Sequence, residues 1–319
     1  MLLRVRRSIV YLSLLFSCIA GVGCFKLSPL PPVSPSQAQE KLIKICQEDY
    51  GLEVHPTAFP HTLWIYLPLK ESFFSIEPSE EEIENSRESK EVPTINFLDG
   101  HFSDGTFLIE FDISSSRRYK KSFGYTSTFS ERYQVIQQNI LAALSRAYAE
   151  VIKNPDKKTD AAPMFFIVII ADIENGLESR MLLNFQDLLR VMTDHSFQEE
   201  FIRRAIIEYP TGSKKIIGDR KGDYLDYHEM TWPEFLVKQM LYRVKFKYER
   251  SAFPPTQEAK EEILDIAAQT VKIYSFADFQ SLRLHDLSTD SLYTIEKSEL
   301  EKRSIPQEPE GRYHILEFR

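Results

Sequence analysis

Apolar runs and alternating segments mark the strands that this chain is expected to form. Residues 62–69 and 164–172 are apolar at almost every position, which is typical of strands buried on both faces of a sheet. Residues 106–113 alternate between apolar and polar side chains, which predicts a strand with one exposed face. Asn175-Gly176 is a preferred two-residue hairpin turn, so we expect the chain to return as a strand at 178–184.

Helical periodicity is clearest between residues 128 and 153. Thr128 and Glu131 have the spacing of a capping box, and the apolar positions after them recur with the helical period. Thr231 and Glu234 repeat this spacing ahead of a helix that we expect to reach about residue 248. The same patterns predict further helices at 38–49, 186–192, 197–207 and 258–270, and further strands at 52–54, 271–276, 281–287 and 313–318.

The order of these elements predicts an α+β fold with a mixed or mostly antiparallel sheet and packed helices. Helix, strand, strand recurs at 38–69, 128–184 and 258–287, so helix-strand-strand units are a candidate building pattern. The helices that open the first and third copies align in sequence, although amphipathic helices also match by chance. The body, residues 38–319, is one large domain or two, with a candidate boundary near 251–257.

Size and charge narrow the classes of protein that remain. With 319 residues, 43% of them hydrophobic, the chain can bury a core, which excludes disorder throughout. The formal net charge is −8, and loss of a leader with Arg4, Arg6 and Arg7 would take it to −11. An acidic body repels polyanions, so we expect no nucleic-acid partner. With only three cysteines in the chain, and two of them in the leader region, Cys46 would remain alone as a buried thiol rather than a bridge or zinc ligand.

The first two dozen residues have the pattern of a secretion signal. Three arginines precede a short apolar run, residues 8–20, and small residues follow it. The run is short for a membrane span, but retention as an uncleaved anchor stays open. Residues 24–37 are rich in proline and serine, a composition that favours an extended tether.

The junction Gly21-Val22-Gly23-Cys24 resembles that of a bacterial lipoprotein. The resemblance implies cleavage after residue 23, acylation of Cys24 with fatty acids such as palmitate, and anchoring by lipid at the cell envelope. The family pattern has Leu three positions before the cysteine where this chain has Gly21, which leaves ordinary cleavage open, and Cys18 is a second, poorer candidate. We therefore expect export, with the outer membrane or the periplasmic face favoured.

Clusters of charged residues are candidates for contact or metal sites. Glutamates crowd residues 71–95, where a solvated loop is favoured over a cation site. A basic cluster at residues 117–121 could touch lipid headgroups, but a charged strand edge is preferred. The histidines lack a His-Glu-x-x-His pair. Two loops could hold a metal weakly, but surface polar clusters of this kind are far commoner; their residues are His55, His61, Asp223, Asp226, His228 and Glu229.

The sequence assigns no catalytic residue, cofactor or metal ligand. A Gly-x-Ser-x-Gly elbow is absent, and residues 211–215 lack the glycine spacing of a phosphate loop. Asp172, at the end of an apolar strand, is the first suspect for a carboxylate site, with a structural carboxylate at a hairpin edge as the favoured interpretation. We therefore favour a non-catalytic binding or scaffold protein tethered to the envelope, with an envelope protein as partner. The alternative is an envelope hydrolase whose carboxylates are brought together by the fold.

Overall fold

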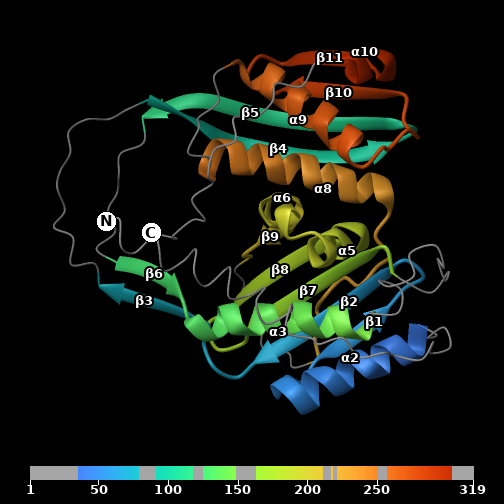
Figure 1. Ribbon diagram of the computed structural model, residues 1–319. Coiled ribbons are helices and arrows are strands. Elements are labelled where there is room, and N and C mark those ends of the chain that lie inside the picture. Colours follow the sequence, from blue (N-terminus) through green and yellow to red (C-terminus); the bar gives the residue numbers. More distant parts are fainter. Residues whose placement is uncertain are drawn as a thin grey trace. The chain divides into compact units, whose positions relative to one another are not determined.

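The computed structural model describes residues 35–78, 91–117, 125–148, 163–210, 217, 221–250 and 257–303. It confirms an α+β fold with mixed sheets. The chain divides into two compact units (Figure 1). Unit 1 takes the described residues between Met1 and Glu77 and between Ser127 and Glu229, and unit 2 those between Pro78 and Thr126 and between Met230 and Phe318. Residues 251–256, near which the sequence placed a candidate boundary, lie outside the described part.

Unit 1 is built on a five-stranded sheet in the order β1-β2-β7-β8-β9. Strand β2 is parallel to β7, and the other neighbours are antiparallel. Its strands are β1 (His55–Ala58), β2 (Thr62–Leu69), β7 (Phe165–Asp172), β8 (Leu177–Asn184) and β9 (Ile206–Glu208). Its helices are α2 (Pro35–Tyr50), α3 (Glu131–Ala147), α5 (Phe185–Thr193), the 3₁₀ turn η1 (His195–Phe197) and α6 (Gln198–Arg204). Strands β3 (Phe74–Pro78) and β6 (Tyr125–Phe129) pair in a separate sheet.

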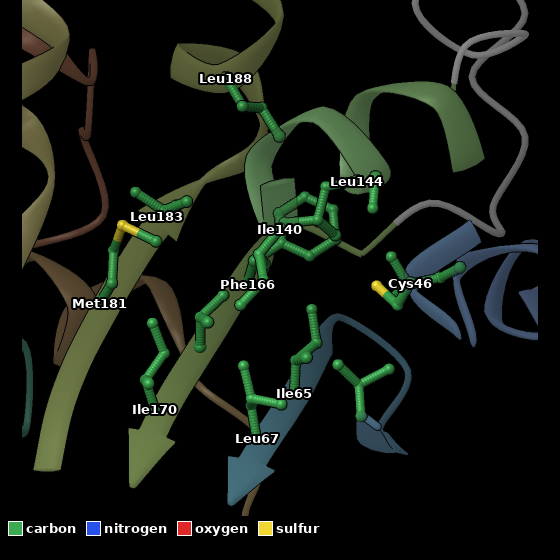
Figure 2. Close-up of a cluster of buried hydrophobic side chains, with 14 of the residues drawn as sticks. Cys46, Ile65, Leu67, Ile140, Leu144, Phe166, Ile170, Met181, Leu183 and Leu188 are labelled. Carbon is green, nitrogen blue, oxygen red and sulfur yellow. The ribbon is translucent and has the colours of Figure 1, made fainter. Parts of the chain in front are cut away.

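The core of unit 1 lies between one face of this sheet and its helices. Figure 2 shows side chains of β2, β7 and β8 directed toward Ile140 and Leu144 on α3 and toward Cys46 on α2. Ile140 and Leu144 are fully buried, as is Phe166 on β7. Burial of a side chain of this size contributes about 1.5–3 kcal/mol. The apolar side chains of α3 and those of the strands therefore pack against each other and form the core of unit 1.

Unit 2 contains a four-stranded sheet in the order β11-β10-β5-β4. Its strands are β4 (Glu91–Ser103), β5 (Thr106–Arg117), β10 (Ser281–Asp286) and β11 (Ser291–Glu296). Its helices are α8 (Trp232–Lys245), the π-helical turn η2 (Phe246–Arg250), α9 (Ala259–Ile273) and α10 (Lys297–Lys302). Helix α8 approaches β4 so closely at Gly100 that an added Cβ would lie 3.2 Å from Val237 Cγ1. Helix α8 thus covers the face of the sheet to which Gly100 belongs, and Phe107, Ile109 and Phe111 of β5 are buried on the same face.

The two sheets share one connectivity. In each sheet, two antiparallel hairpins lie side by side. The adjacent strands of the two hairpins are parallel, and these are β2 with β7 in unit 1 and β5 with β10 in unit 2. Helix, strand, strand occurs as α2-β1-β2 and as α3-β7-β8, in the order that the sequence suggested. It occurs a third time as α9-β10-β11, but this copy ends at Glu296 rather than at 287, because β11 replaces the strand predicted at 271–276. Equivalent positions in α2 and α9 are buried alike, since Leu42 and Ile263 are both fully buried.

Several local predictions need correction. Residues 271–276 are not a strand, because α9 continues to Ile273 and keeps Val271 buried on the same stripe as Ile263 and Ala267. The first strand is 55–58 rather than 52–54. Ser130, not Thr128, caps α3, its side chain accepting from Tyr133 N at 3.3 Å. The predicted loop at 71–95 contains β3 and the start of β4, and the predicted strand at 313–318 lies outside the described residues.

Candidate functional site

Asp172, the carboxylate first suspected from the sequence, is saturated by hydrogen bonds. It is fully buried at the end of β7, on the helix-covered face of the sheet. Its two oxygens accept from the backbone N–H groups of Phe73 (3.2 Å), Glu174 (3.1 Å) and Asn175 (2.9 Å), and from the side chains of Ser72 and Asn175. With five donors on its two oxygens, this carboxylate stabilises the β7–β8 turn. This is the structural role that the sequence favoured over a catalytic one.

The same carboxylate explains why the turn is longer than predicted. Residues 173–176 form a four-residue connection in which Gly176 has a φ of 68°, rather than a two-residue turn at Asn175-Gly176. Asp172 Oδ1 accepts from the N–H groups of Glu174 and Asn175, and in a two-residue turn the N–H of Glu174 would bond across the ladder instead. Capture of these amides by an aspartate is a typical local competitor of strand pairing.

Glu178 is a second buried carboxylate and lies on the opposite face of the sheet. The register pairs Asp172 with Leu177 and Ala171 with Glu178, so the two acids point to opposite sides. Only 1% of the Glu178 side chain is exposed. Its Oε2 accepts from Arg180 Nε at 2.6 Å, and its Oε1 accepts from the phenol of Tyr224. Burial, and then the hydrogen bond to Glu178, hold the pKa of Tyr224 well above its usual value.

Tyr224 belongs to residues 221–229, which we call the covering segment because it packs on this second face of unit 1. Trp64 donates its indole N–H to the carbonyl of His228 at 2.7 Å and meets the ring of Tyr227 edge-on at 5.3 Å. Gly222 has a φ of 73°, and a Cβ there would lie 2.5 Å from Tyr227 Oη. The face beneath is apolar and buried; its residues include Trp64, Tyr66, Phe165, Ile167 and Ile169.

The equivalent face of unit 2 is polar and exposed. Along β5 the residues between Phe107, Ile109 and Phe111 alternate out of the core, and Arg283 and His285 do the same on β10. We call this surface the open face; its residues are Phe97, Asp99, His101, Leu108, Glu110, Asp112, Arg283, His285, Leu292 and Thr294. Phe97 is 43% exposed and Leu292 60% exposed, among the few large apolar side chains to be so in the described residues.

A histidine between two carboxylates lies on the open face. His285 Nδ1 is 3.1 Å from Glu110 Oε1 on the neighbouring β5, and His285 Nε2 is 3.2 Å from Asp290 Oδ1 in the β10–β11 turn. The hydrogen bonds to Glu110 and then to Asp290 raise the pKa of His285. The carboxylates therefore favour the charged form of the ring. The two contacts link β10 to β5 and to the β10–β11 turn.

The remaining residues singled out from the sequence are only partly brought together. His61 and Glu229, assigned to different loops, meet at 4.0 Å between Nε2 and Oε1, while His228 Nδ1 contacts the carbonyl of Asp226 at 2.8 Å. Within the described ranges no group of three or more His, Cys, Asp or Glu residues is arranged to hold a metal ion. Burial raises the pKa of the Cys46 thiol to about 11, in keeping with an inert core residue.

The lipidation candidate Cys24 lies outside the described residues, as do residues 118–121 of the basic cluster and 79–90 of the acidic stretch. Among the helices that the structure does describe, none has both the length and the apolar character needed to cross a bilayer.

Glu178, Tyr224 and His285 were missed by reasoning from the sequence. Glu110 and His285 alternate with apolar neighbours, a signal that indicates a half-exposed strand face, but their pairing joins positions 175 residues apart. Comparison of the chain with protein-family models, with curated proteins and with solved structures gave no match.

Proposed function

We propose that this chain is a lipid-anchored cell-envelope protein with a non-catalytic binding role. The leader pattern and the Gly23-Cys24 junction support the location, because a short apolar run followed by small residues and cysteine is what lipoprotein processing requires. The open face of unit 2 supports the binding role. Its proposed occupant is a basic segment of another envelope protein.

The observation that carries the binding role is the contrast between the two sheets. The second face of unit 1 is apolar and is covered by its own chain at residues 221–229. The topologically equivalent face of unit 2 exposes Asp99, His101, Arg283 and Leu292. A polar surface with a few exposed apolar side chains has the composition of a non-obligate protein interface.

Charge on this face favours a basic partner. Arg283 and the ring of His285 are set against five carboxylates of the face and its margin; these are Asp99, Glu110, Asp112, Asp290 and Glu296. Complementary charge steers association and fixes register more than it adds affinity. A segment with lysine or arginine beside an apolar side chain would meet both the carboxylates and Leu292.

The β7–β8 hairpin does not favour the alternative of a carboxylate hydrolase. Such an enzyme needs two acids in one site, where they flank the bond that is cleaved. Asp172 and Glu178 point to opposite faces of the sheet, and each is engaged by donors of its own chain.

Anchoring is tested by metabolic labelling with palmitate. The wild-type chain should incorporate the label, and Cys24→Ser should not, while both accumulate. An unlabelled wild-type protein that still carries Met1 in the cytosol would refute the anchoring.

Binding is tested with a photo-crosslinking amino acid placed at Leu292 in the native host. Val135 on α3, which is 49% exposed, is the matched control position. The expected product is a discrete adduct from position 292 that position 135 does not give. The protein in that adduct, once purified, should bind the wild-type chain roughly tenfold more tightly than the Asp99→Lys variant.

Glu53→Lys makes the same charge change on an exposed residue of unit 1 and should leave this affinity unchanged. Equal adducts from both positions, or equal loss of affinity in both lysine variants, would refute the assignment of the open face.

A further inference from the structure

His285 occupies a position in which both of its ring nitrogens face carboxylate oxygens. Nδ1 lies 3.1 Å from Glu110 on β5, and Nε2 lies 3.2 Å from Asp290. An ionised carboxylate only accepts hydrogen bonds, and a neutral imidazole carries one N–H. Both contacts can therefore be hydrogen bonds only when the ring carries two protons.

The turn that His285 reaches is fastened separately at its two ends. At the first end, Asp286 Oδ1 accepts from Ser288 N at 2.9 Å and from Ser288 Oγ at 2.7 Å. At the second end, Asp290 has a φ of 52°, a left-handed conformation that is uncommon for a residue with a side chain. Its side chain is 95% exposed, and its Oδ1 contacts Nε2 of His285. Only the second fastening depends on an imidazole.

The charges around His285 come from three strands of the sheet and from the turn. On β5 they are Glu110 and Asp112, on β4 Asp99 and His101, on β10 Arg283 and Asp286, and in the turn Asp290; the neighbouring β11 residues are Leu292 and Thr294, which carry no charge. Carboxylates outnumber the cations here, which favours a proton on His285.

We propose that His285 is a proton-controlled clasp, whose charged ring ties Asp290 of the β10–β11 turn to Glu110 of β5 and releases one of them on losing a proton. The step is a simple acid–base exchange with water, in which the ring loses one N–H hydrogen bond. Because this turn leads into β11 and Leu292, the clasp makes the outer part of the open face sensitive to pH. Its effect on partner binding rests on the proposed function, whereas the clasp itself does not.

The direction of the effect follows from the raised pKa of His285. The clasp is fully present below the ordinary histidine value of about 6.5 and is lost as the pH rises through the higher value of the folded protein. An envelope compartment that acidifies would therefore tighten the turn.

The clasp is tested by hydrogen exchange of the amides at residues 288–291 in the full-length protein, with rates corrected for the intrinsic effect of pH. Protection in the wild type should fall roughly tenfold between pH 5.5 and pH 8.5, since one charge-assisted hydrogen bond is lost. His285→Gln and Asp290→Asn should abolish this pH dependence. His101→Gln, on the same face, should retain it.

A titration of ¹³C-labelled histidine supplies the second measurement. The His285 ring should titrate above 6.5 in the wild type and closer to 6.5 in Asp290→Asn. A midpoint at or below 6.5, or turn protection that is equal at both pH values, would overturn the clasp. Neither measurement requires a partner, so a failed crosslink at Leu292 and a failed clasp are separate outcomes.

Discussion

Removal of one phenol oxygen from Tyr224 should loosen the covering segment of unit 1. The Tyr224→Phe change leaves the ring that packs on Tyr66 but deletes the donor to Glu178 Oε1. Glu178 then keeps Arg180 alone, at 2.6 Å, on a side chain that is 1% exposed. Hydrogen bonds to a buried charged group contribute about 1.5–3 kcal/mol, so the free energy of unfolding of unit 1 should fall by that amount. For a body of this size, the melting temperature should fall by about 3–12 °C.

Urea unfolding followed by tryptophan fluorescence measures this loss in unit 1. The chain has two tryptophans, and Trp64 lies in unit 1 while Trp232 lies in unit 2. In a Trp232→Phe background the signal reports the packing of Trp64 against Tyr227 and His228. Each unit can thus be followed without assuming that both unfold together.

Tyr148→Phe is the matched control. Tyr148 is 4% exposed in the same unit, and in the described part of the chain its phenol makes no hydrogen bond. Its loss should change the free energy of unfolding by less than about 0.5 kcal/mol. If Tyr224→Phe is no more harmful than Tyr148→Phe, Glu178 does not fasten the covering segment and the assignment fails.

Three further outcomes follow from buried groups of unit 1. Asp172→Asn should destabilise the unit by about 2–3 kcal/mol in the same urea assay, because an amide cannot accept from all the donors that meet Asp172; an unchanged midpoint would contradict this. Gly222→Ala should lower the free energy of unfolding by about 2 kcal/mol or more, since the φ of Gly222 is 73° and the new methyl group would meet Tyr227 and Tyr66. A smaller loss than that caused by Glu53→Ala would refute the close contact. Cys46, with a pKa of about 11, should resist iodoacetamide at pH 8 in the folded protein and react in urea; alkylation at equal rates in both states would show that the thiol is not buried.

Local signals in the sequence predicted most of the elements that carry the core. Strand β2 spans the residues of the predicted 62–69 run, and Thr231 caps α8 through Glu234 N as its spacing indicated. These predictions succeeded because a continuous apolar strand and a side-chain cap each depend on neighbours within a few residues. The error at 271–276 has the opposite cause. Val271 and Ile273 are β-branched and suit a strand, but burial of Val271 on the α9 stripe decided the conformation.

The candidate surface could be anticipated only in part. Alternation along 106–113 predicted a strand with one exposed side, and β5 has this character. Which strand would lie beside it could not be deduced, because the parallel pairing of β5 with β10 joins segments far apart in the chain. The meeting of Glu110 with His285 follows from that pairing, and the meeting of Tyr224 with Glu178 follows from the packing of the covering segment on unit 1; neither follows from a local pattern.

The chain order of the two units has a consequence for how the protein can be made. Strands β4 and β5 of unit 2 are synthesised between β2 and β7 of unit 1, so the first half of each unit precedes the second half of the other. Neither unit can be obtained free of the other by a single truncation, since any single cut that keeps one unit whole also keeps a hairpin of the other. A ribosome delivers both first hairpins before either parallel pair can close, so the sheet of unit 1 can form first, whereas the β4–β5 hairpin must wait for β10, near the end of the chain.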